Sequence, residues 1–149
     1  MSCLAELNSH FKAIVDCHTS QYAELTEKWK LLDCLIKEYD SIKYPVFCLD
    51  NIVLQKKLIT TEMHIINSLR MKDVDKYTAL LDKYKTISMD LIDKSGDDTD
   101  SLIIAEGSEK EQAYIELCNY LKSQVDVYSN TLENLISYIR AKKILENRS

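Results

Sequence analysis

Only two glycines and one proline occur in the 149 residues of this chain. Average proteins contain about 7% glycine and about 5% proline, and tight turns depend on both residues. A chain this poor in turn residues has few turns, so long helices are the structure it favours. The spacing of the apolar residues indicates where those helices lie.

The first forty residues carry one helical seam that begins at Leu4 and reaches Tyr39. Apolar positions recur at steps of three or four residues, with a double step of four around His18 that acts as a local stutter. Tyr44-Pro45 then ends the pattern, because the residue before a proline is disfavoured in the helical region. We predict a helix over about residues 2–40.

The last forty residues carry the most regular pattern. Ser108 is followed three residues later by Glu111, the capping box that marks the start of a helix. From Tyr114 to Ile139 the apolar residues alternate steps of four and three, which is typical of coiled-coil-like packing. We predict a helix over about residues 108–146.

The middle of the chain, residues 50–94, has a helical composition and a less regular seam. At Arg70-Met71-Lys72-Asp73 the aspartate can cap a new helix, but no glycine or proline enforces a turn. The sequence favours one long helix here, with a break near 70–73 as the alternative. The predicted fold is a single all-α domain over residues 1–149, an elongated antiparallel bundle of three long helices, or of four if the break exists.

The segment 95–107 holds both glycines, Gly96 and Gly107, together with four acidic residues and no basic ones. We expect an acidic loop between helices, with Gly96 closing one helix and Gly107 preceding the next. Carboxylates are ligands that Ca²⁺ prefers, but a calcium-binding helix–loop–helix needs its glycine within the run of acids, and Gly96 precedes them. We therefore predict no metal site in this segment.

Three branched apolar residues, Leu102, Ile103 and Ile104, interrupt this acidic segment. Exposed loops seldom carry such a run. It either folds back over the end of the core or binds a partner, and the sequence leaves both interpretations open.

Sequence motifs for catalysis are absent. The chain has no HExxH sequence, no Walker phosphate loop and no dinucleotide-binding fingerprint. Its three histidines, His10, His18 and His64, form no Glu-x-x-His pair of the kind that builds metal sites in helical bundles. We expect no catalytic site, no cofactor and no bound metal, and we predict that the protein is not an enzyme.

The charge distribution and the cysteines bear on location. The net charge is −5 and no segment is strongly basic, so nucleic-acid binding is not expected. The apolar runs are too short to span a bilayer, and the N-terminus lacks the pattern of a secretory signal. Five cysteines, an odd number without a CxxC pair, suit a reducing compartment. We predict an intracellular protein, cytoplasmic or nuclear, that is not secreted and binds no membrane.

Residues 29–54, on both sides of Pro45, are richer in apolar residues than one helix face requires. In a three-helix rod a partner or a second copy must cover this excess. In a four-helix bundle the 95–107 loop returns to the same end and can cover it internally. The residues that we expect to anchor a partner are Trp29, Leu35, Phe47 and Val53, and, if the loop docks, Leu102, Ile103 and Ile104.

By elimination, the sequence predicts a non-enzymatic helical adaptor or structural subunit of a larger intracellular assembly. It would bind protein partners, or a second copy of itself, through coiled-coil-like apolar helix faces. One alternative is a self-contained bundle that captures a partner helix in a groove, as signalling modulators do. Another is a helical-bundle enzyme or ligand carrier with an unrecognised cavity.

Overall fold

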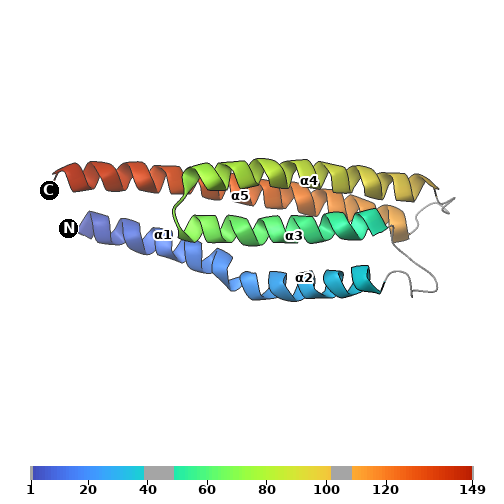
Figure 1. Cartoon of the computed structure of the whole chain (residues 1–149). Helices are drawn as coiled ribbons and strands as arrows, with labels where there is room; N and C mark the ends of the chain where they lie inside the picture. The colour runs from blue at the N-terminus through green and yellow to red at the C-terminus, as the bar shows by residue number, and fades with distance from the viewer. Residues whose placement is uncertain (1, 39–48, 102–108, 149) are drawn as a thin grey trace.

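The computed structural model describes residues 2–38, 49–101 and 109–148. In these residues the helices are α1 (Ser2–Ser20), α2 (Tyr22–Lys37), α3 (Leu49–Arg70), α4 (Val74–Ser101) and α5 (Glu109–Arg148). They run side by side along one axis and form an elongated bundle, with both termini at the same end (Figure 1). The predicted all-α bundle is confirmed.

A tight turn separates α3 from α4, so the favoured single helix over 50–94 was wrong and the break near 70–73 is present. Lys72 adopts a left-handed conformation with φ 56°. Its amide donates to the Leu69 carbonyl at 3.1 Å, and the Asp73 amide donates to the Ser68 carbonyl at 3.0 Å. These two bonds satisfy carbonyls at the end of α3 in the pattern of a Schellman motif.

Asp73 also begins α4, as its position in the sequence suggested. Its carboxylate accepts a hydrogen bond from the Lys76 amide at 3.1 Å, the usual role of an N-cap side chain. One residue thus takes part in the end of α3 and the start of α4. This explains how the chain reverses without glycine or proline.

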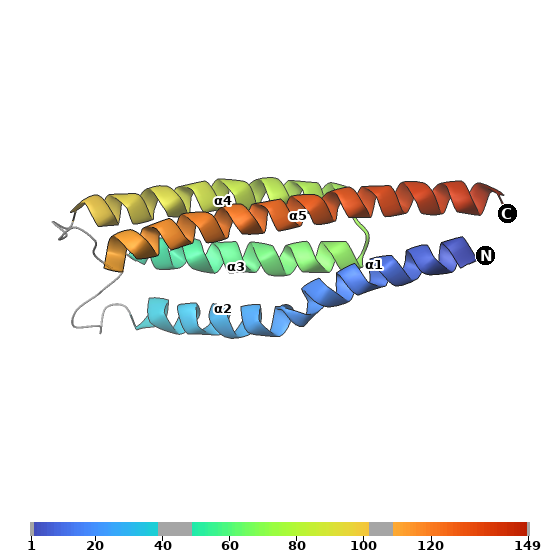
Figure 2. The ribbon, with the colours of Figure 1, turned by 180° about the vertical axis from the view of Figure 1, so that it is seen from behind.

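The predicted helix over 2–40 is divided at Gln21, which lies between α1 and α2. The bend follows the stutter at His18, where the seam loses its regular phase. Residues 39 and 40 lie outside the described residues. Before the bend α1 packs against α5 and α3, whereas beyond the bend α2 packs chiefly against α3 (Figure 2).

The expected loop over 95–107 is helical in its first part, because α4 continues through Gly96 to Ser101. A glycine inside a helix costs about 1 kcal/mol relative to alanine, so a single glycine need not end one. Residues 102–108 lie outside the described residues, and so does the expected cap at Ser108. The fifth helix begins at Glu109, next to the predicted start.

The core has two parts, and α3 contributes to both. The larger cluster joins α1, α3, α4 and α5 and contains Phe11, Ile65, Tyr84, Tyr128 and Leu135, among others. The smaller cluster joins α2 to the opposite side of α3, and its buried members are Leu25, Leu32, Ile52, Ile59 and Ile66. Since α3 lies between two clusters, it is apolar on two faces.

Candidate functional site

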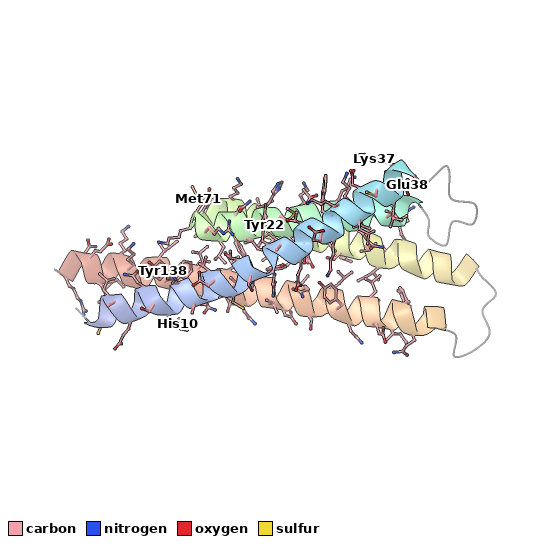
Figure 3. The ribbon with its side chains drawn as sticks, turned by 90° about the horizontal axis from the view of Figure 1, so that it is seen from below. His10, Tyr22, Lys37, Glu38, Met71 and Tyr138 are labelled. Carbon is pink, nitrogen blue, oxygen red and sulfur yellow. The ribbon has the colours of Figure 1, made fainter. Side chains whose placement is uncertain are left out.

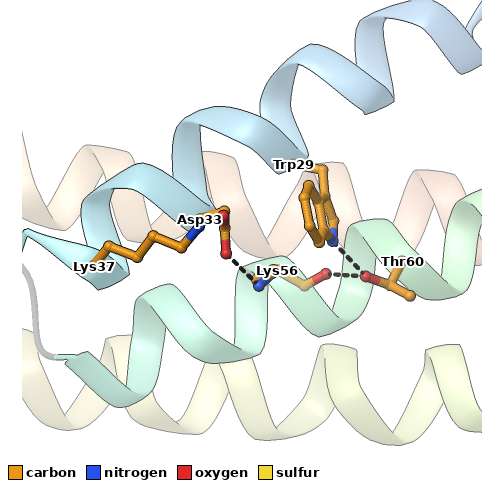
Figure 4. Close-up of polar contacts among 5 residues, drawn as sticks. All are labelled: Trp29, Asp33, Lys37, Lys56 and Thr60. Carbon is orange, nitrogen blue, oxygen red and sulfur yellow. Dashed lines mark hydrogen bonds and ion pairs between the residues drawn. The ribbon is translucent and has the colours of Figure 1, made fainter.

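The interface between α2 and α3 contains Trp29, one of the residues expected to anchor a partner. Its indole nitrogen donates to the Thr60 hydroxyl at 3.0 Å. The ammonium nitrogen of Lys56 lies 4.4 Å from the centre of the indole ring. The structure therefore places the half-buried Trp29 side chain on α3 (Figure 4).

An ion-pair network lies beside Trp29 and also joins the two helices. The Asp33 carboxylate is 2.7 Å from the ammonium of Lys56 and 2.9 Å from that of Lys37. The hydrogen bonds from Lys56 and Lys37 hold the pKa of Asp33 below its usual value. Asp33 therefore stays ionised at neutral pH and bridges a lysine of α3 and a lysine of its own helix (Figure 4).

The other predicted anchors have different surroundings. Leu35 packs at the margin of the smaller cluster, and Val53 is half-buried. Phe47 and the triplet Leu102, Ile103 and Ile104 lie outside the described residues. The apolar excess of residues 29–54 is therefore used in large part between α2 and α3.

One side of α2 does not pack on α3, and it carries an exposed leucine. Leu31 keeps 61% of its surface accessible. Lys28 and Leu35 lie three residues before it and four residues after it, so the three side chains form one row on the helix. We call Lys28, Leu31 and Leu35 the α2 row.

The larger core contains a buried carboxyl group, Glu62, which the sequence analysis did not select. The hydroxyls of Tyr84 and Tyr128 donate to its Oε1 at 3.1 and 3.3 Å. Burial raises the pKa of Glu62, while the two hydrogen bonds and the charge of Lys28 act in the opposite direction. The spacing of the sequence could have revealed Glu62. It lies three residues after Ile59 and four before Ile66, so an acidic residue occupies a position of the apolar helical seam.

The surroundings of Glu62 have a structural explanation. Burial raises the pKa of both tyrosine hydroxyls, and the neighbouring carboxylate raises each of them further. Both hydroxyls therefore stay protonated and remain hydrogen-bond donors at neutral pH. A carboxyl that accepts two such bonds joins α3, α4 and α5 in one register, a recognised use of polar groups in helical cores.

A second polar contact joins α1 to α5. The His18 ring nitrogen Nε2 lies 2.9 Å from the Thr131 hydroxyl oxygen. That hydroxyl donates its own proton to the Val127 carbonyl at 2.9 Å, so His18 must be the donor to it. The other ring nitrogen, Nδ1, is buried without a hydrogen-bond partner, and burial lowers the pKa of His18.

Two observations on the part of the chain that the structure describes concern metal ions and membranes. No three His, Cys, Asp or Glu side chains there are grouped so that they can hold a metal ion. None of the helices in the described segments combines the length and the apolar character needed to cross a bilayer. The described cysteines, Cys3, Cys17, Cys34 and Cys118, are free thiols.

Comparison of the chain with known protein families, curated proteins and solved structures gave no match. Its function is therefore argued from its own residues.

Proposed function

We propose that this chain is a non-enzymatic helical adaptor or structural subunit that binds a protein partner through an apolar helix face. The observation that carries the proposal is Leu31. A leucine with 61% of its surface accessible contributes little to the fold, yet it adjoins Leu35, which lies at the margin of the contact between α2 and α3. A few side chains that become buried in an interface supply most of its binding energy.

The network around Trp29 supports the same proposal. The Asp33 ion pairs and the Trp29–Thr60 hydrogen bond fix α2 on α3. The α2 row is therefore presented on a helix that is already held in place. A preformed surface binds at a lower entropic cost than one that must become ordered.

Affinity capture from the native cell, followed by mass spectrometry, tests this function. Leu31→Asp should lose the partner that the wild-type protein retains. Met89→Asp is the matched control, because Met89 is 67% exposed and lies on α4. Equal partner recovery with wild type and Leu31→Asp would show that the α2 row has no binding role.

A further inference from the structure

The bend between α1 and α2 is a single residue whose backbone is still helical. Gln21 has φ −80° and ψ −15°, a right-handed helical conformation, and no side-chain hydrogen bond caps α2 there. Its carbonyl accepts a hydrogen bond from the Leu25 amide at 3.0 Å, as it would in a continuous helix. The sequence has no glycine or proline at the bend, and the apolar seam continues through it. Only a small backbone change therefore separates the bent chain from one straight helix.

A serine side chain marks the bend. The Ser20 hydroxyl donates to the Cys17 carbonyl at 2.8 Å. The Gln21 amide donates to the His18 carbonyl, three residues earlier, at 3.2 Å. In a regular α-helix that amide would donate to the Cys17 carbonyl, four residues earlier. Ser20 thus occupies the acceptor that a straight helix would use, because serine side chains compete with backbone donors in helices.

The bend is also contacted from α3 by one arginine. The Arg70 Nε donates to the Thr19 hydroxyl of α1 at 3.2 Å. The same guanidinium lies 5.5 Å from the centre of the Tyr22 ring of α2. Arg70 is exposed, and cation–π contacts at exposed sites are weak. These contacts on the two sides of the bend therefore oppose its straightening only slightly.

The first helix is held on the bundle by few buried side chains. Among the α1 side chains that the structure describes, Phe11 and His18 are the buried ones. Phe11 stacks on Tyr138 with a centroid distance of 4.2 Å, and His18 is hydrogen-bonded to Thr131. The Asn8 side-chain oxygen accepts from the Tyr138 hydroxyl at 2.6 Å. We call the face of α5 that carries Thr131 and Tyr138 the α1 seat.

We propose that α1 of one copy packs on the α1 seat of a second copy, so that two chains exchange their first helices. The exchange repeats the contacts of the monomer between two chains, and only the backbone around Gln21 has to change. The Trp29 and Asp33 contacts keep α2 on α3, and a straight continuation of α2 would carry α1 away from its own α5 (Figure 1). This inference goes beyond the proposed function, because the exchange leaves the α2 row unchanged.

The direction of α1 determines how the two copies are arranged. The chain proceeds along the bundle from His10 of α1 past Tyr22 to Lys37 of α2 (Figure 3). Straightening the bend moves α1 sideways but leaves its N-terminus pointing toward the same end. The α5 that accepts it must therefore run in the same direction as the α5 of the donor. The exchanged dimer is parallel, with its two-fold axis along the bundles.

Sedimentation velocity over a range of concentrations, after long incubation, tests the exchange. Ser20→Ala removes the hydroxyl that competes for the Cys17 carbonyl, so it should favour the straight helix. One hydrogen bond changes an equilibrium about fivefold and the dimer contains two bends, so the dimerisation constant should rise at least about tenfold. Ser9→Ala is the matched control, because Ser9 is exposed on α1 away from the bend. It should change the constant less than about twofold.

A mixture of two variants tests which surfaces meet in the dimer. Phe11→Asp disables the donated helix and Tyr138→Asp disables the α1 seat, so each variant alone should remain monomeric. Their equimolar mixture should contain a heterodimer, because α1 of the Tyr138→Asp chain can pack on the intact seat of the Phe11→Asp chain. Phe11→Ser and Tyr138→Ser, which add no charge, replace these variants if either fails to fold. The comparison of Ser20→Ala with Ser9→Ala needs no buried substitution and decides alone if the serine variants also unfold.

Four outcomes would overturn the inference. Wild type and Ser20→Ala both stay monomeric, or Ser20→Ala and Ser9→Ala dimerise equally. A folded Phe11→Asp chain dimerises alone as strongly as wild type, which would place the dimer interface elsewhere. The mixture of the two folded variants forms no heterodimer although wild type dimerises. Partner capture that depends on Leu31 would leave the proposed function standing in each of these cases.

Discussion

His18 donates a hydrogen bond to Thr131 over 2.9 Å, joining α1 to α5 in the last turn before the chain bends away. The contact lies close to the end of α1, which is Ser20. Because the unpartnered Nδ1 of His18 is buried, protonation would place an uncompensated charge inside the bundle. The contact is therefore sensitive to acid.

We predict that His18 makes folding stability fall in mild acid. Burial lowers the pKa of His18 below 6.5, so the unfolded chain binds a proton more readily than the folded one. The stabilising contribution is complete above about pH 6.5 and is lost as the pH falls through the lowered folded-state pKa. His18→Gln keeps a donor for Thr131 and cannot titrate in this range. The difference in unfolding free energy between variant and wild type should therefore change from pH 7.5 to 5.5, as measured by urea denaturation, whereas a constant difference would exclude this role.

The pH dependence that Glu62 gives to folding stability should be opposite in sign to that of His18. Its pKa is raised by burial, so its contribution to stability is complete below the unfolded value and is lost as the pH rises through the folded one. Glu62→Gln can still accept bonds from Tyr84 and Tyr128 but carries no charge. Its stability relative to wild type should rise from pH 4.5 to pH 8 in the same urea experiment. A relative stability that falls over this range would contradict a raised pKa.

A control variant, Glu62→Leu, separates charge from hydrogen bonding. It removes the acceptor of both tyrosine hydroxyls, and each unpaired buried hydroxyl costs about 1–3 kcal/mol. This loss should be present at both ends of the pH range. If Glu62→Leu is as stable as Glu62→Gln, the two hydrogen bonds contribute nothing to the fold.

The turn between α3 and α4 offers a backbone prediction. A left-handed conformation costs roughly 1–2 kcal/mol for a residue with a side chain and almost nothing for glycine. Lys72→Gly should therefore raise the free energy of unfolding by about 0.5–1 kcal/mol, since the lysine also has weak contacts with the rings of Phe11 and Tyr138. Lys83→Gly, at an exposed position inside α4, should lower it by a similar amount. Equal destabilisation by both changes would argue against the left-handed turn.

The all-α fold was predictable because the seams persist for tens of residues without interruption. The stutter at His18 was visible, but a single helix over about residues 2–40 was predicted, and its division at Gln21 was not. The turn at 71–73 was not decided by the sequence, because a lysine occupies the left-handed position that glycine usually takes. Asp73 correctly indicated the start of a new helix there. Its capping role depends on hydrogen bonds, which the spacing of apolar residues does not reveal.

The candidate site was predictable only in part. Trp29 and Leu35 were selected from an apolar excess, but the excess did not reveal which side of α2 would pack on α3. The exposure of Tyr120 and Val127 on α5 was missed for a related reason. Tyr120 and Val127 lie one position before Leu121 and Tyr128, so the regular main seam conceals a second one beside it. A helix with two neighbours carries two seams, and only the packing shows which of them is left open.

The central claim is that Leu31, in the α2 row, belongs to a binding face and is not required by the fold. Partner capture and unfolding free energy, both measured on Leu31→Asp, test it most directly. We predict a free energy of unfolding within about 0.5 kcal/mol of wild type, as for most surface changes, together with loss of the captured partner. Leu32→Asp, one residue further along and buried, should instead unfold the domain, because a buried unpaired charge costs several kcal/mol. Retention of the partner by a stable Leu31→Asp protein, or unfolding of Leu31→Asp itself, would contradict the claim.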